Sequence, residues 1–190
     1  MAASLRTFIA VKIEPNPELL RLVKHLKETF EKEKIKWVEE NNLHLTLKFL
    51  GDTSPLQVEQ VKELLLKTGE NFSSFHFDLK GIDFFKRNRQ PNVLFANIDK
   101  KDFLKQIAAE IDDKLADLGF EKEKRDFNPH LTLGRIKYLK NKVHFYETVD
   151  EYRDQFIQHV EIDEIIYYQS ILKTDGPAYK SLVKVSLDSF

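Results

Sequence analysis

The feature that most constrains the fold of this chain is a repeated tetrapeptide, His-Leu-Thr-Leu. It occupies residues 44–47 and recurs at residues 130–133, 86 positions later. Six histidines and eight threonines in 190 residues give about 0.25 His-x-Thr triplets by chance, before any flanking leucine is required. Two copies with leucine at all four flanking positions therefore indicate an internal repeat and not a coincidence.

The alternation within each copy is typical of a β-strand, whose successive side chains point to opposite faces. His44 and Thr46 then share one face, while the leucines of that copy share the other face with Phe49. The second copy repeats the arrangement with His130 and Thr132. Each strand is expected to anchor itself in a core through its leucines. Two such strands can bring two imidazoles to opposite sides of one small ligand.

Two facing histidines suit phosphodiester chemistry. A neutral imidazole accepts a proton from the nucleophile, and a protonated imidazole donates one to the leaving oxygen. The hydroxyls and any nearby cation hold the non-bridging oxygens as charge develops on them. A metal site is a poorer interpretation, because the near neighbours are leucines, threonines, Lys48 and Arg135, whereas metal-binding histidines lie beside carboxylates or further histidines. A half-buried structural histidine would explain one copy, but not a matched pair.

The rest of the chain mixes helix and strand patterns. Asn16 before Pro17 and Ser54 before Pro55 predict helix starts, and Gly119 predicts a helix end. The order lacks the strict βαβα alternation of a parallel sheet, so an α+β protein with largely antiparallel sheets is expected. Helices are predicted at about 17–34, 55–68, 101–118 and 149–156, and strands at about 6–13, 37–38, 43–50, 72–85, 93–98, 130–136, 159–173 and 178–186.

Composition excludes several classes of protein. The chain has no cysteine, which excludes a disulfide scaffold, a thiolate zinc site, an iron–sulfur cluster and a cysteine nucleophile, and suits a reducing cytosol. No stretch approaches the ~20 apolar residues of a membrane span, and the first residues lack an apolar signal core. We therefore expect a soluble, cytoplasmic protein without a membrane partner.

The charges are unevenly distributed along the chain. A net charge of −1 excludes a globally basic nucleic-acid binder. Residues 121–142 nevertheless contain seven lysines and arginines against three acidic residues, and residues 86–89 add three more cations. A solvated charged face has the same composition. The position of the run beside the second tetrapeptide also fits a groove that follows a phosphate chain.

Four blocks of the sequence resemble, in order, the two-histidine (2H) phosphoesterase superfamily. Within it the chain is most similar to the RNA 2′,3′-cyclic phosphodiesterases, formerly called 2′-5′ RNA ligases. The blocks are residues 6–13, residues 37–51 and 127–135 around the two tetrapeptides, and residues 169–172 with 175–179. The resemblance implies one bilobal domain over residues 1–190 with one His-x-Thr-x motif per lobe. It implies an α+β, duplicated fold in which two largely antiparallel sheets flank a central active-site cleft, with helices on the outer faces.

The resemblance also implies an activity. It is the hydrolysis of an RNA or nucleotide 2′,3′-cyclic phosphate to a 2′-phosphomonoester, without a metal and without a cofactor. His44 would be the proton donor and His130 the proton acceptor, although nothing in the sequence itself shows which histidine has which role. Thr46, Thr132 and Arg135 would bind the phosphate. The expected partners are RNA 3′ ends or nucleotides that carry a 2′,3′-cyclic phosphate, bound by a monomer.

Two alternative functions use the same residues. One is a nucleotide or RNA-end binding module without turnover, against which the two intact histidines argue. The other is 2′-5′ RNA ligation, in which a 5′-hydroxyl replaces water as the nucleophile. Product analysis separates the three hypotheses, because they predict a 2′-phosphomonoester, no product or a new 2′-5′ linkage.

Strand parity makes a prediction for two cations. Arg135 shares the parity of the leucines in the second motif, which would point it away from the histidine. We expect the strand to end or twist at Gly134, since glycine tolerates such a break, so that Arg135 reaches the phosphate. Lys48 has the parity of His44, and we expect it to be a solvated surface residue.

Three phenylalanines, Phe8, Phe84 and Phe85, are candidates to stack on a terminal base. We expect at least two of the three to be core residues. The other histidines lack a threonine partner and are left out of the mechanism; they are His25, His76, His144 and His159.

Overall fold

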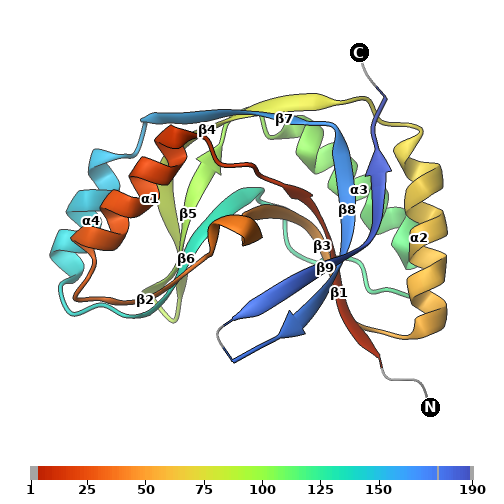
Figure 1. Cartoon of the computed structure of the whole chain (residues 1–190), viewed down its shortest axis with the longest axis horizontal. Helices are drawn as coiled ribbons and strands as arrows, with labels where there is room; N and C mark the ends of the chain where they lie inside the picture. Colours follow the sequence, from red (N-terminus) through yellow and green to blue (C-terminus); the bar gives the residue numbers. More distant parts are fainter. Residues whose placement is uncertain (1–3, 175, 189–190) are drawn as a thin grey trace.

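Two antiparallel sheets carry the repeated tetrapeptide, one copy in each (Figure 1). The computed structural model describes residues 4–174 and 176–188. One sheet has the strand order β3-β1-β8-β9 and the other the order β2-β6-β5-β4-β7. The strands are β1 (Leu5–Lys12), β2 (Lys34–Trp37), β3 (His44–Thr53), β4 (Phe75–Arg87), β5 (Gln90–Ile98), β6 (His130–Tyr138), β7 (Phe156–Ile162), β8 (Glu164–Leu172) and β9 (Pro177–Ser186).

Four α-helices in the described residues cover the outer sides of the two sheets (Figure 1), and a short 3-10 helix, η1 (Glu40–Asn42), precedes β3. The α-helices are α1 (Pro17–Thr29), α2 (Pro55–Gly69), α3 (Asp102–Ala116) and α4 (Lys142–Glu151). Helices α2 and α3 contact the first sheet at β9 and β3, whereas α1 and α4 contact the second at β7 and β4. Every pairing between named strands is antiparallel. The predicted α+β fold with largely antiparallel sheets and outer helices is therefore confirmed.

The helix starts predicted from the sequence have the expected caps. The Asn16 side chain accepts a hydrogen bond from the backbone N–H of Leu19 at 2.8 Å. Ser54 and Gln57 form a reciprocal capping box at the start of α2. The helix prediction before Gly119 is also confirmed, although α3 ends at Ala116.

Three predicted elements were wrong, each because pairing or capping overrode the local pattern. Helix α1 ends at Thr29 instead of near 34, because Lys34 already pairs with β6. The last short helix spans 142–151, not 149–156, and begins where the Asn141 side chain accepts a hydrogen bond from the N–H of His144. The expected long strand at 159–173 is two strands, since the chain passes from one sheet to the other at Asp163.

Two predicted connections also need comment. The connection between β4 and β5 is shorter than expected, because it consists only of Asn88 and Arg89. Their φ angles are 52° and 63°. Positive φ at both central residues is the geometry that suits a two-residue hairpin. The predicted turn after β8 includes Gly176 and Pro177, and its first residue, Asp175, lies outside the described residues.

The leucines of both tetrapeptides are buried, as the strand period predicts. Leu45, Leu47, Leu131 and Leu133 are each at most 5 % exposed and belong to one continuous apolar cluster. At about 25 cal/mol per Å² of apolar surface, each buried leucine contributes roughly 1.5–3 kcal/mol. These four side chains therefore fix both histidine-bearing strands to the core. Within the described residues, no helix has the length and apolar composition needed to cross a membrane.

Candidate active site

The two repeated histidines begin β3 and β6 and make the same hydrogen bond. His44 Nδ1 lies 2.6 Å from the backbone carbonyl oxygen of Asn42, and His130 Nδ1 lies 2.8 Å from that of Asn128. A carbonyl oxygen only accepts, so Nδ1 carries the proton in both rings. The neutral imidazoles therefore leave Nε2 without a proton, ready to accept one, and each ring is held in a fixed orientation.

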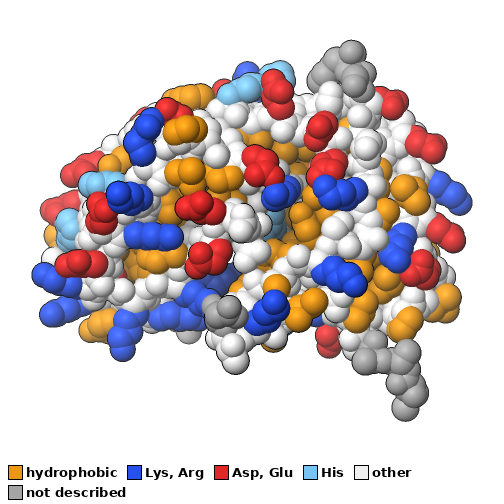
Figure 2. All heavy atoms as spheres, in the orientation of Figure 1, with side chains coloured by type: hydrophobic (Ala, Val, Ile, Leu, Met, Phe, Trp, Pro, Cys, Tyr) orange, Lys and Arg blue, Asp and Glu red, His pale blue; other side chains and the backbone are white. Residues whose placement is uncertain are grey.

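Aromatic rings flank both imidazoles. The rings of Phe8 and Tyr179 each lie 5.1 Å from that of His44, centroid to centroid. Phe85 and Phe95 lie 4.8 and 5.2 Å from His130, both edge to face. These rings keep water from the sides of the imidazoles. Histidine atoms are visible in a recess near the middle of the face shown in Figure 2, among hydrophobic side chains.

Burial lowers the pKa of both histidines below the ordinary value of 6.5. The carbonyl bonds at Nδ1 oppose this shift, because they favour the protonated ring. The positive charge of Arg135 lowers both pKa values further, and His130 and Lys101 add smaller effects on His44 and His130 respectively. Both rings are therefore biased toward the neutral form in the free protein, and a nearby anion would oppose this bias by favouring the protonated form.

The two threonines follow their histidines on the same strands. Thr46 and Thr132 are half-buried. Among residues 4–174 and 176–188, no protein group is hydrogen-bonded to either hydroxyl. Each hydroxyl can therefore donate to an external acceptor such as a phosphate oxygen.

A β-bulge in each motif strand reverses the alternation after the second leucine. On β3, Thr46 faces Ala10 of β1 while Lys48 faces Ile9, so Leu47 is an extra residue without a partner. Lys48 consequently turns inward and is 9 % exposed, while Phe49 turns outward and is 64 % exposed. The predicted positions of both residues, Phe49 in the core and Lys48 at the solvated surface, were wrong.

The same bulge occurs on β6 and moves Arg135 to the face of His130. Thr132 faces Phe95 while Gly134 faces Leu94, so Leu133 is the extra residue. Gly134 is buried and Arg135 is exposed. The positive charge of Arg135 acts to lower the pKa of both histidines and of Tyr179. The expected change of parity near Gly134 is present, although its cause is the bulge before the glycine.

Lys48 is held in a buried ion pair that ties the first motif to the approach to the second. Its ammonium contacts the carboxylate of Asp112 on α3 and donates to the carbonyl oxygen of Glu121 at 2.8 Å. Asp112 also accepts from the N–H of Glu123 at 3.1 Å. Residues 117–129, which lead into His130, are therefore fastened to the strand that begins with His44.

The three candidate stacking residues have different surroundings. Phe8 is 2 % exposed and stacks on Tyr168 at 5.2 Å, so it supports His44 from inside. Phe84 packs on Phe145 of α4 at 5.4 Å. Phe85 is half-buried and stacks on Phe95 at 4.2 Å beside His130. Of the three, Phe8 alone is a buried core residue, whereas Phe84 is half-buried and packs against the core from outside, so the expectation that at least two of the three are core residues was wrong.

Sequence reasoning missed that the repeat includes an asparagine two residues before each histidine. The Asn42 side chain donates to the carbonyl oxygen of Pro177 at 3.0 Å, and the Asn128 side chain accepts from Lys101 at 3.2 Å. These bonds steady the two loops whose carbonyls orient the imidazoles. The signal was present in the sequence, because both copies read Asn-x-His-Leu-Thr-Leu.

Within the described residues, no group of three His, Cys, Asp or Glu side chains is placed to hold a metal ion. The donor set beside His44 and His130 consists of hydroxyls, a guanidinium and aromatic rings. Hydroxyls and a guanidinium suit an anion better than a cation. The absence of a metal from the reaction stays a prediction.

Comparison with protein families gives a match over most of the chain. The model of the LigT like Phosphoesterase family matches residues 11–95 and 98–179. An RNA 2′,3′-cyclic phosphodiesterase of Thermotoga maritima is 33% identical over 186 residues, which are 97% of this chain and 96% of the relative. A protein of the same name from Methanocaldococcus jannaschii is 33% identical over 176 residues, 93% of this chain and 97% of the relative.

Solved structures show the same fold. TT0787 of Thermus thermophilus superposes with a TM-score of 0.78 at 23% identity, covering 97% of this chain and 99% of the other. E. coli LigT complexed with 3′-AMP superposes with a TM-score of 0.74 at 23% identity, covering 97% of this chain and 98% of the other. At these identities the likeness concerns the arrangement of the sheets and helices.

Proposed function

The chain belongs to the LigT-like phosphoesterases of the 2H superfamily, and we propose that it hydrolyses 2′,3′-cyclic phosphates at RNA ends or on nucleotides to 2′-phosphomonoesters. One observation carries the proposal: two histidines on different sheets have Nδ1 bonded to the carbonyl of residue i−2, which leaves both Nε2 atoms for proton transfer. The curated relatives named RNA 2′,3′-cyclic phosphodiesterase support the substrate class.

The proposed reaction is an in-line displacement at phosphorus. His130 accepts a proton from water as the water oxygen forms a bond to phosphorus. The bond from phosphorus to the 3′-oxygen breaks, and His44, protonated in the complex, donates its proton to that oxygen. The products are a 2′-phosphomonoester and a free 3′-hydroxyl. Proton exchange with solvent returns both histidines to their starting states.

The phosphate supplies the charge that makes this cycle possible. Since burial and Arg135 lower both histidine pKa values, the free site holds few protons at neutral pH. A bound phosphodiester anion offsets the charge of Arg135 and favours a proton on one imidazole. Thr46, Thr132 and Arg135 then donate to the non-bridging oxygens as negative charge grows there. We further propose that the protein acts in the cytoplasm, as a monomer, without a metal or another cofactor.

The deciding experiment is product analysis with 2′,3′-cyclic AMP in the presence of EDTA. Release of 2′-AMP is the expected result. Release of 3′-AMP would mean that the 2′-oxygen leaves instead of the 3′-oxygen, and this result would contradict the mechanism. Nucleotide binding without product over hours would identify a binding module, and loss of activity on chelation, restored by added metal, would overturn the metal-free scheme.

A further inference from the structure

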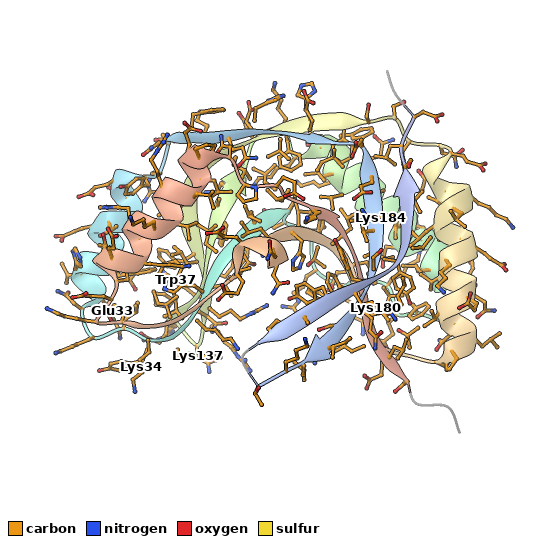
Figure 3. All side chains as sticks on the ribbon, viewed as in Figure 1. Glu33, Lys34, Trp37, Lys137, Lys180 and Lys184 are labelled. Carbon is orange, nitrogen blue, oxygen red and sulfur yellow. The ribbon has the colours of Figure 1, made fainter. Side chains whose placement is uncertain are left out.

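A group of cations continues outward from Arg135 along the edge of the second sheet. Lys36 on β2 is directly opposite Arg135 on β6, and Lys34 is opposite Tyr138. Lys34, Lys36 and Lys137 are all exposed. We call these three lysines the basic edge. Figure 3 shows Lys34 and Lys137 close to each other at one margin of the molecule, and Figure 2 shows Lys and Arg side chains gathered there.

The three lysines of the basic edge have no neutralising acidic partner among the described residues. Lys137 and Arg135 belong to the basic run of residues 121–142, at whose start Lys122 pairs with Asp113 at 2.7 Å and Arg125 lies 4.0 Å from Glu123. Among the described residues, no acidic side chain lies within 4.0 Å of the basic-edge ammonium groups or of Arg135. Like charges on neighbouring strands repel one another, and this repulsion destabilises the folded protein. A bound polyanion would reduce the repulsion.

The packing beneath β2 keeps this edge in place. Gly134 on β6 is directly opposite Trp37 of β2, and a Cβ there would come within 2.8 Å of Ile35 Cγ2 and 3.3 Å of Trp37 Cε3. Ile35 and Trp37 thus pack over the glycine against the core, and the lysines between them point outward. Figure 3 shows Trp37 lying inward of Lys34. The basic edge is therefore attached to the strand that carries His130 and Arg135.

The part of β6 that runs from the proposed phosphate site to the basic edge is long enough to lie along more than one nucleotide. From Thr132 to Lys137 the strand extends roughly 16 Å at about 3.3 Å per residue. The Lys36 ammonium comes within 3.8 Å of where a Cβ would stand on Gly176, so the edge begins beside the β8–β9 turn of the first sheet. At the far end, Tyr138 is 60 % exposed. Cations interleaved with an exposed aromatic ring are typical of surfaces that bind single-stranded nucleic acid.

We propose that the basic edge binds the backbone phosphates of the RNA that precedes the cyclic end, and so selects oligonucleotides over cyclic mononucleotides. This inference rests on the proposed function, because Arg135 must hold the terminal phosphate for the edge to receive the next ones. Arg87, the last residue of β4, and Arg89 in the β4–β5 turn extend the same positive end of the sheet.

The test compares a short single-stranded RNA ending in a 2′,3′-cyclic phosphate with the cyclic mononucleotide. The variant is Lys34→Gln/Lys137→Gln, which removes two charges that lie beyond Arg135. Its KM for the oligonucleotide should rise about tenfold at moderate salt, with kcat retained. The slope of log KM against log salt should fall by about 1.4, at ~0.7 per phosphate contact on a single strand.

The matched control is Lys67→Gln/Lys105→Gln, which removes two exposed lysines from α2 and α3. It should leave both the oligonucleotide KM and its salt slope at the wild-type values. An unchanged salt slope in Lys34→Gln/Lys137→Gln, or a wild type that does not prefer the oligonucleotide, overturns the proposal.

A binding measurement separates this proposal from the proposed function. The probe is a fluorescent RNA of the same length ending in a 2′-phosphate, which needs no turnover. If the wild type hydrolyses nothing but binds this RNA with the steeper salt slope, the activity is wrong and the basic edge is supported. If wild type and double variant bind it with equal salt slopes, the basic edge is wrong whatever the activity.

Discussion

Strands β3 and β6 are alike up to their β-bulges and differ immediately after them. Both begin with a histidine bonded to the carbonyl of residue i−2, continue with a half-buried threonine and insert one extra leucine. After the bulge, β3 has Lys48 inside and Phe49 outside, whereas β6 has Gly134 inside and Arg135 outside. The shared part holds the groups proposed for proton transfer. In the divergent part, β3 has a structural anchor, whereas β6 has a cation that we propose to bind phosphate.

The difference shows how one repeated motif serves two purposes. On β3 the inward residue reaches α3 and fixes the loop that leads to His130. On β6 the inward residue is a glycine, so Ile35 and Trp37 of the neighbouring strand β2 pack over it, and the pairing of β2 with β6 brings the basic edge beside Arg135. Replacing residues at equivalent places on the two strands therefore tests which features are common and which are specific.

The largest effect is expected where the strands are alike. His44→Ala and His130→Ala should each lower kcat about 10³-fold, since one proton transfer contributes about 10²–10⁴-fold. The residual activity should distinguish the two roles. If His130 is the proton acceptor, as proposed, the low-pH limb of the rate profile disappears in its variant. If His44 is the donor, the high-pH limb disappears in its variant.

The measurement is the pH–rate profile of each variant with 2′,3′-cyclic AMP, and circular dichroism checks the fold. His25→Ala, on the exposed side of α1, is the control and should keep the wild-type profile. Retention of more than a tenth of the wild-type rate in either motif variant would contradict equal involvement of the two strands. Exchanged limbs would instead reverse the assignment of donor and acceptor.

The next effect concerns stability and only β3. Lys48→Met leaves Asp112 buried without its cation, and breaking a buried pair in this way costs about 3 kcal/mol of unfolding free energy. The two side chains are 9% and 17% exposed. The double variant Lys48→Met/Asp112→Leu removes both charges and should recover most of the loss. Urea unfolding measures all three free energies.

A surface ion pair provides the control for this experiment. Lys62→Met breaks the pair with Glu59, whose side chains are 26% and 66% exposed, and should cost less than about 1 kcal/mol. A Lys48→Met variant as stable as Lys62→Met would show that the buried pair is not an anchor.

The bulges explain why the sequence predicted the histidines and threonines better than the residues that follow. Strict alternation places His44 and Thr46 correctly, because side-chain direction within a strand is a local property. The extra residue at Leu47 is defined by the register against β1, more than thirty positions away in the chain. No local pattern reports that register, so Lys48 and Phe49 were assigned to the wrong faces.

The misplaced helix boundaries have the same kind of cause. The apolar spacing of α1 continues through Phe30, yet residue 34 joins β2 because a partner strand is available. In α4, Phe145 and Val149 lie four residues apart on the buried side, which is too short an apolar pattern to define where the helix begins. The sheet order, which puts β3 and β6 in different sheets, also depends on distant pairing.

The third prediction concerns Arg135, where the two strands diverge. Arg135→Ala removes a guanidinium from the proposed phosphate site and should lower kcat/KM about 10²-fold, because a hydrogen bond to a charged group contributes about 1.5–3 kcal/mol. Its charge lowers the pKa of both histidines, so its removal raises both. The whole bell-shaped profile of kcat/KM should therefore move to higher pH.

Two comparisons make the Arg135 result specific. Arg135→Lys keeps the positive charge but loses the planar guanidinium, which can donate two parallel hydrogen bonds. This variant should therefore be less active, while its kcat/KM should depend on pH as in the wild type. Phe49→Leu alters the equivalent place on β3 without removing a charge, and the profile should not move. If Arg135→Ala shifted the profile to lower pH, or left it in place, its charge would not act on the histidines. The divergence of the two strands would then concern packing alone.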